Sequence, residues 1–193
     1  MPLGSVLLVG LSILLMAATE TEERVIVDFG DRDATWRPIN DSVMGGLSRG
    51  RLRVTPENTA VFEGEISLEN NGGFSSVRGS LGRMDLSRFE GLAVRVRGDG
   101  REYQIRLRTD ASFDGVAYRA SLTPPADSWQ VVRVPFAKFA PTFRGRRPVG
   151  APPLDVREIR QLGFLIADKQ AGPFRLEIAW VRAYTHERGV TEE

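Results

Sequence analysis

Short segments in which apolar and polar residues alternate follow one another along most of this 193-residue chain. Residues 92–97 read Leu-Ala-Val-Arg-Val-Arg and residues 103–108 read Tyr-Gln-Ile-Arg-Leu-Arg, with the turn sequence Gly-Asp-Gly at 98–100. Alternation with a period of two predicts strands that bury one face, and the turn between them predicts a β-hairpin. One face of this hairpin would be apolar, and the other would carry four arginines, Arg95, Arg97, Arg106 and Arg108.

Other segments have the same short, β-branched or alternating character, and evenly spaced turns separate them. We expect strands at 24–29, 59–67, 73–80, 116–122, 130–135, 163–167 and 174–184. In the last of these, Trp180 is expected to share a core-facing side with Leu176 and Ile178. A helix is indicated only at 155–162, for one or two turns. Eight or nine short strands predict an all-β protein, an antiparallel β-sandwich with one short helical turn.

The chain divides into three parts. Residues 24–185 contain no repeat or linker and have the size of one ordinary domain, with a proline- and arginine-rich surface loop at 141–153. A polar tail follows at 186–193. Residues 1–18 carry no ionisable side chain, and the apolar run at 6–18 is as long as the core of a signal peptide but too short to span a bilayer. We therefore expect export or an N-terminal anchor as the only membrane contact, with a cytoplasmic location as the alternative.

The ionisable residues exclude several classes of chemistry. Lysine and arginine together number 26 against 25 acidic residues, so no overall field attracts nucleic acid. The chain has no cysteine and only one histidine, His186, which excludes thiol catalysis and multi-histidine metal sites. Asp28, Asp31 and Asp33 could hold Ca²⁺, but their spacing is not that of an EF-hand, and a role in turns is favoured. We expect no metal, no cofactor and no catalytic residue.

Residues 36–48, Trp-Arg-Pro-Ile-Asn-Asp-Ser-Val-Met-Gly-Gly-Leu-Ser, depart from strand chemistry. Asn, Asp and Ser set turns, and a glycine pair permits positive φ or close backbone approach. Such a loop can present backbone N–H groups and a carboxylate to a ligand, or it can cap the sandwich with Trp36 and Met44 as a plug. The candidate partner- or ligand-binding residues, here and in the Gly-Gly-Phe sequence at 72–74, are Trp36, Asn40, Asp41, Ser42, Met44, Gly45, Gly46, Gly73 and Phe74.

Six blocks, at 41–48, 62–68, 71–78, 86–103, 129–136 and 159–166, occur in an order that resembles the CIA30 family. This family comprises the mitochondrial complex I intermediate-associated protein 30 and its bacterial and plant relatives, and the resemblance covers about residues 25–184. The resemblance implies a jelly-roll β-sandwich of the galactose-binding-like type. It also implies an assembly factor for respiratory complex I (NADH:ubiquinone oxidoreductase), not a catalyst.

The sequence is compatible with two functions from different classes. The favoured one is a non-catalytic, chaperone-like module that binds a protein partner and assists assembly of a complex. The alternative is a module that binds a small ligand or a carbohydrate, with Trp36 as the stacking platform. An enzyme acting through Asp41 and Ser42 has no residue pattern behind it. The hairpin arginines are interpreted as a solvent face, although on a concave face they would suit carboxylate or phosphate ligands or an acidic partner protein.

Overall fold

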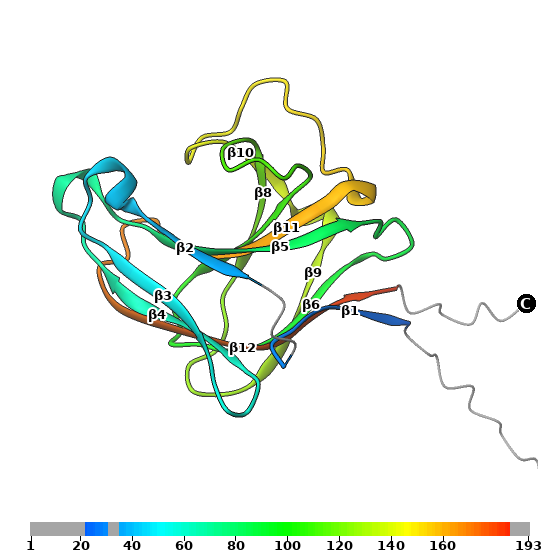
Figure 1. Ribbon diagram of the computed structural model, residues 1–193, viewed down its shortest axis with the longest axis horizontal. Coiled ribbons are helices and arrows are strands. Elements are labelled where there is room, and N and C mark those ends of the chain that lie inside the picture. Colours follow the sequence, from blue (N-terminus) through cyan, green and yellow to red (C-terminus); the bar gives the residue numbers. More distant parts are fainter. Residues whose placement is uncertain (1–21, 31–34, 186–193) are drawn as a thin grey trace, which may run out of the picture.

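The computed structural model describes residues 22–30 and 35–185, in which twelve strands form two antiparallel sheets packed face to face (Figure 1). This confirms the expected antiparallel β-sandwich. The order in sheet A is β3-β4-β12-β6-β9, with β1 added against β12, and the order in sheet B is β10-β8-β7-β11-β5-β2. The strands of sheet A are β1 (Glu23–Asp28), β3 (Arg49–Val54), β4 (Ala60–Ile66), β6 (Gly91–Arg97), β9 (Gln130–Pro135) and β12 (Gly172–Tyr184). Those of sheet B are β2 (Trp36–Asn40), β5 (Ser75–Met84), β7 (Tyr103–Arg108), β8 (Ala117–Leu122), β10 (Ala140–Thr142) and β11 (Ile159–Ile166).

The core lies between the two sheets and takes the apolar side of nearly every strand. Phe62 and Leu176 of sheet A and Ile105 and Phe164 of sheet B have no exposed surface. Alternation places the residues between them on the two outer faces, as expected for strands that bury one side only. The outer faces therefore carry the polar residues from which a surface site can be built.

Residues 91–108 do not form the expected hairpin. Strand β6 pairs with β9 and β12 in sheet A, whereas β7 pairs with β8 and β11 in sheet B. The turn after β6 is therefore a crossover between sheets, stabilised by Asp99, whose Oδ2 accepts hydrogen bonds from the Tyr103 hydroxyl (2.9 Å) and the Arg175 amide (2.8 Å). Asp99 thus joins the turn to β7 and β12, and the two arginine pairs lie on opposite faces of the molecule.

Strand β12 departs from strict alternation. Its pairing with β6 shifts register between Ile178 and Trp180, so that Val181 and Ala183 become the buried residues. The prediction of Trp180 as a core residue is therefore wrong: it is only half-buried, and the Arg182 guanidinium lies 4.2 Å from its ring centroid. A β-bulge changes which side chains face the core without any signal in the apolar pattern.

The described residues contain more short elements than expected. Strands β2, β3 and β10 add to the predicted set, and four 3₁₀ turns replace the single helical turn. These turns are η1 (Asp41–Met44), η2 (Glu69–Asn71), η3 (Phe136–Lys138) and η4 (Val156–Glu158), of which η4 lies where helix was expected. No helix within residues 22–30 and 35–185 is long and apolar enough to span a membrane. The apolar segment 1–18 and the tail 186–193 lie outside the described residues.

Candidate functional site

Two segments meet at one end of the sandwich and form what we call the tip, residues 41–48 and 67–74. The first segment contains η1 and joins β2 to β3, and the second contains η2 and joins β4 to β5. Figure 1 shows these connections, in blue and teal, side by side at the end away from residues 22 and 185. The Asn70 side chain donates a hydrogen bond to the carbonyl oxygen of Gly45 (3.2 Å), which links the two segments at the surface.

The Asp41 carboxylate holds the tip together from inside. Its Oδ1 accepts a hydrogen bond from the Ser48 amide (2.9 Å), and its Oδ2 accepts hydrogen bonds from the amides of Gly73 (2.6 Å) and Phe74 (3.3 Å). Asp41 has no exposed surface, so its carboxylate does not reach the surface where a ligand was expected to meet it. It positions the two segments instead.

Two glycines make room for this carboxylate. A Cβ atom added to Gly46 would overlap the Asp41 side chain, and one added to Gly72 would lie 2.5 Å from its Oδ2. The close approach anticipated for the glycine pair therefore occurs at Gly46, toward the protein interior. Gly45 has the left-handed φ of 86° that ends η1.

The hydrogen bonds also decide the protonation state of Asp41. Burial alone would raise the pKa of its carboxyl, but the hydrogen bonds from Ser48, Gly73 and Phe74 outweigh burial and hold that pKa below its usual value. Asp41 is therefore an anion at neutral pH whose acceptor capacity is taken up by backbone amides. It has no free base function to offer a substrate.

Four apolar side chains of the tip are exposed. Val43 and Met44 are each 65% exposed, Leu47 is 49% exposed and Leu68 is 44% exposed. Apart from Met44, the sequence pattern does not single these residues out, because a turn exposes side chains without regular spacing. A cluster of exposed apolar residues on a rigid turn is typical of a protein-binding surface.

The other candidate residues take different places. Ser42 is exposed on η1, Phe74 is half-buried, and Gly73 lies between the two segments. Asn40 donates a hydrogen bond to the Gly50 carbonyl (3.2 Å) and accepts one from the Ser75 hydroxyl (2.7 Å), so it joins β2 to its neighbours.

Trp36 is not a loop residue and does not form a stacking platform. It begins β2, and its ring packs 5.5 Å from that of Phe29 and 6.2 Å from that of Phe164, measured between centroids. The alpha carbon of Gly79 lies beneath the indole, where a Cβ atom would come within 3.0 Å of the ring. A sugar platform needs an open tryptophan face at the surface. The contacts of Trp36 with Phe29, Phe164 and Gly79 place its ring in packing between strands instead.

The residues considered for calcium binding and for catalysis lie partly outside the described residues. Asp28 accepts a hydrogen bond from the Gly30 amide (2.9 Å), which is the turn role favoured for it, whereas Asp31, Asp33 and His186 lie outside the described residues. Within residues 22–30 and 35–185, no three side chains of the metal-binding types come together.

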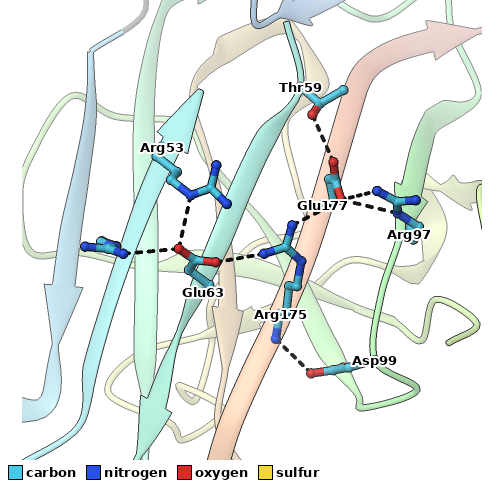
Figure 2. A network of polar contacts seen from close by, with 8 residues as sticks. Arg53, Thr59, Glu63, Arg97, Asp99, Arg175 and Glu177 are labelled. Atoms are coloured by element: carbon cyan, nitrogen blue, oxygen red, sulfur yellow. Dashed lines mark hydrogen bonds and ion pairs between the residues drawn. The ribbon is translucent and has the colours of Figure 1, made fainter. Parts of the chain in front are cut away.

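The outer face of sheet A carries an ion-pair network (Figure 2). Glu63 accepts hydrogen bonds from Arg51, Arg53 and Arg175 at 2.9–3.3 Å, and Glu177 accepts them from Arg97 (2.7 Å) and Thr59 (3.1 Å). Burial would raise the pKa of both carboxyls, but the arginines hold it below the usual value. Four arginines share two glutamates in this network, and each of the four contacts a carboxylate.

A sequence model described as "Complex I intermediate-associated protein 30 (CIA30)" matches residues 27–178. The chain belongs to the CIA30 family. It is 30% identical over 186 residues to the mouse protein named complex I intermediate-associated protein 30, mitochondrial, and 28% identical over 193 residues to the Drosophila melanogaster protein of that name. The alignments cover 85% and 88% of this chain but 57% and 64% of those relatives, so the chain spans less than two thirds of their length. Neither name is that of an enzyme.

Carbohydrate-binding modules are among the solved structures that share this fold. The chain is similar to the family 11 carbohydrate-binding module of the cellulase Lic26A-Cel5E of Clostridium thermocellum, with a TM-score of 0.65, 17% identity, and coverage of 88% of this chain and 98% of that one. A family 29 carbohydrate-binding module gives a TM-score of 0.51 at 11% identity, with coverage of 86% and 93%. Similarity at this identity shows the fold alone, a β-sandwich.

Proposed function

We propose that this CIA30 protein is a non-catalytic interaction module that docks to a protein partner through its tip and assists assembly of a complex of the respiratory complex I type. The observation that carries the proposal is the exposed apolar cluster of Val43, Met44, Leu47 and Leu68 on a buried frame. The unit of function is the sandwich of residues 24–185. The names of the mouse and Drosophila relatives support the choice of complex.

The rigidity of the tip favours docking. Asp41 fixes η1 against residues 73 and 74 through backbone hydrogen bonds, so the apolar side chains are presented without a large ordering cost on binding. Exposed apolar residues that remain in place in the free protein are those from which interface cores are built.

The tip also lies far from the N-terminal segment. Residues 22 and 185 are adjacent, joined by a hydrogen bond from the Thr185 amide to the Glu22 carbonyl (3.1 Å), at the other end of the molecule (Figure 1). Residues 1–18 are proposed to direct export or to anchor the chain, and an anchor at this end would leave the tip open to a partner. The relatives are named as mitochondrial proteins. Sequencing the N-terminus of the natural product will show whether residues 1–18 are removed.

The proposal is tested by co-purification of complex I subunits with the tagged full chain from its own cells. Replacing Val43 and Met44 together by serine removes apolar surface from side chains that are 65% exposed, so folding is expected to be unaffected. We expect recovery of the subunits to fall at least fivefold, and blue native gels to show less assembled complex.

A matched control removes exposed apolar surface elsewhere. Val54 is 50% exposed on β3 and Val149 is fully exposed in the loop before β11, and the double change Val54→Ser/Val149→Ser should leave recovery at the level of the unaltered chain. Equal recovery with the tip variant and the control, or no recovery of complex I subunits with the unaltered chain, would rule the proposal out.

A further inference from the structure

Four arginines stand in one line across the outer face of sheet B, and we call them the arginine row. The strand register places Arg37 opposite Arg78 and Arg119 opposite Arg106, with Gly163 between the two pairs. The neighbours of Arg78 and Arg106 along their strands are buried, so alternation directs these side chains away from the core. Neighbouring strands lie about 4.8 Å apart, so the guanidinium groups are crowded along this line.

A surface depression lies over the middle of the row. Its lining includes Arg78, Arg106, Arg108, Gln161 and Gly163. Gly163 has no side chain and is buried, so no β11 side chain projects between the two arginine pairs. A second depression lies on the same face beyond Arg106, and its lining pairs the cations Arg119 and Lys138 with the carboxylates Glu102 and Asp168. The first depression has no carboxylate in its lining.

The β7–β8 loop, residues 109–116, borders the first depression and holds two of its arginines. The Nη1 of Arg78 donates a hydrogen bond to the Phe113 carbonyl (2.8 Å), and the Nη1 of Arg108 donates one to the Gly115 carbonyl (3.0 Å). Arg106 donates to the side-chain oxygen of Gln104 (2.9 Å). These acceptors are neutral, so they orient the guanidinium groups without cancelling their charge.

Among the described residues, no carboxylate makes a direct ion pair with this cluster. In the part of the chain that the structure describes, neither the arginine row nor Arg108 has a carboxylate within ion-pair distance. Three acids lie nearby and have other partners: Asp114 pairs with Arg144 at 2.7 Å, Asp110 accepts hydrogen bonds from Ser112, and Asp168 accepts one from Gln104. They act on the arginines only from beyond contact distance. Burial, reinforced by Arg119 and its other cationic neighbours, lowers the pKa of Arg106 to about 10, which still leaves it charged at neutral pH.

The arginines on the two outer faces of the sandwich therefore have different kinds of hydrogen-bond acceptor. On sheet A each arginine of the network in Figure 2 contacts Glu63 or Glu177. On sheet B the half-buried Arg78 and Arg106 repel each other and have only neutral acceptors. Like charges held together in a partly desolvated depression are costly unless a counter-charge binds there.

We propose that the outer face of sheet B binds a small molecule carrying two or more phosphate or carboxylate groups, held between Arg78, Arg106 and Arg108. The planar guanidinium fork suits both groups, since each can accept two parallel hydrogen bonds from it. The depression is small, so the ligand would lie over it and direct its anionic groups toward the three arginines that line it. A compact ligand can contact all three of these neighbouring arginines at once. This inference is independent of docking through the tip.

Other ligands match the face less well. Neutral sugars and single-stranded nucleic acids stack on open aromatic rings. Phe164, which is among the residues lining the depression, turns its ring to the core and has no exposed surface. Phe113 on the β7–β8 loop is exposed, but the Arg78 guanidinium already lies 5.5 Å from its ring centroid.

The test is isothermal titration calorimetry of the full chain at low ionic strength with pyrophosphate in one arm and citrate in the other. Binding of either anion supports the proposal, and the tighter of the two identifies the phosphate or the carboxylate class. The variant Arg78→Gln/Arg106→Gln should weaken binding at least tenfold. A second variant, Arg37→Gln/Arg119→Gln, changes exposed ends of the row, is expected to fold normally, and should weaken binding about threefold.

A matched control removes two charges from the rest of the surface. Arg51 and Arg88 have side chains that are 74% and 79% exposed, and Arg51→Gln/Arg88→Gln lowers the net charge by the same amount. This control should bind like the unaltered chain. Absence of binding in both arms, or equal loss in the control and the row variants, overturns the proposal. Tighter binding of a hexaglutamate peptide than of either small anion also overturns it, in favour of an acidic protein partner.

Discussion

Asp41 determines the geometry of the tip because one carboxylate accepts hydrogen bonds from both of its segments. The Ser48 amide comes from the segment that holds Asp41, whereas the amides of Gly73 and Phe74 come from a segment some thirty residues later. A buried carboxylate anion that accepts three backbone hydrogen bonds stabilises the fold. A neutral acceptor would stabilise it less, and removing the acceptor would leave the amides without a partner. The apolar residues of the tip depend on this arrangement for their position.

Replacing Asp41 by Asn should lower the free energy of unfolding by about 2–4 kcal/mol, because the amide side chain turns an N–H group toward a backbone donor and loses the charge. Urea unfolding followed by circular dichroism measures the change. Asp127→Asn is the control, since Asp127 is exposed and its positive φ of 56° suits Asn. A loss no larger than that of the control would mean that the carboxylate does not hold the tip.

The same carboxylate predicts a pH dependence. Hydrogen bonds hold the pKa of Asp41 in the folded state below its usual value, so the folded protein binds this proton less readily than the unfolded chain. The stabilisation is present above the unfolded pKa, near 3.8, and is lost as the pH falls through the lower folded pKa. The difference in unfolding free energy between the unaltered chain and Asp41→Asn should therefore be constant from pH 7 to 5 and shrink below pH 4. A difference that grows on acidification would contradict this assignment.

The sequence identifies the tip but not the direction of its side chains. Turn formers and a glycine pair predict a tight bend at 41–46, and a 3₁₀ turn is found there. Whether Asp41 points outward or inward depends on amides supplied by Gly73 and Phe74, and no local pattern encodes that long-range contact. The position of Trp36 also depends on a long-range contact. It belongs to β2 because residues 36–40 pair with β5, and the pattern within 36–40 does not show that pairing.

At the scale of elements, the crossover between β6 and β7 shows where local pattern is insufficient. Two alternating segments joined by Gly-Asp-Gly satisfy the rules for a hairpin, yet each strand pairs with other partners. Both arrangements bury the same apolar residues, so periodicity cannot distinguish them. The register of strands far apart in sequence also creates the arginine row, of which only Arg106 belongs to a segment where we expected a basic face.

Asp99 is expected to be essential for the crossover. Its Oδ2 joins the Tyr103 hydroxyl to the Arg175 amide at the start of β12, so Asp99→Ala leaves both donors without this acceptor. The free energy of unfolding should fall by about 2–3 kcal/mol, measured by urea denaturation. Glu65→Ala is the comparison, because Glu65 is an exposed strand residue. A cost for Asp99→Ala as small as that for Glu65→Ala would show that the crossover holds without it.

At the scale of the whole molecule, the two sheets share one core and differ on their outer faces. Phe62 and Leu176 of one sheet pack into the same cluster as Ile105 and Phe164 of the other, so neither sheet can bury its apolar side alone. On the outer face of sheet A the arginines of the network contact carboxylates, whereas on that of sheet B the arginines that line the first depression contact neutral acceptors. A net charge of +1 conceals this asymmetry, which is why composition alone does not indicate an anion site.

A shared core predicts that the sheets unfold together. Trp36 lies in sheet B and Trp180 in sheet A, so variants that keep one tryptophan each, Trp129→Phe/Trp180→Phe and Trp36→Phe/Trp129→Phe, report on the sheets separately. In each variant the fluorescence and far-ultraviolet circular dichroism transitions in urea should coincide, as expected for a two-state domain. Leu107→Ala in sheet B and Leu176→Ala in sheet A should each lower the midpoint for both reporters, at about 2–5 kcal/mol per site. If Leu107→Ala shifted only the Trp36 transition, the two sheets would unfold as independent units. The tip and the arginine row would then not be held together by a single core.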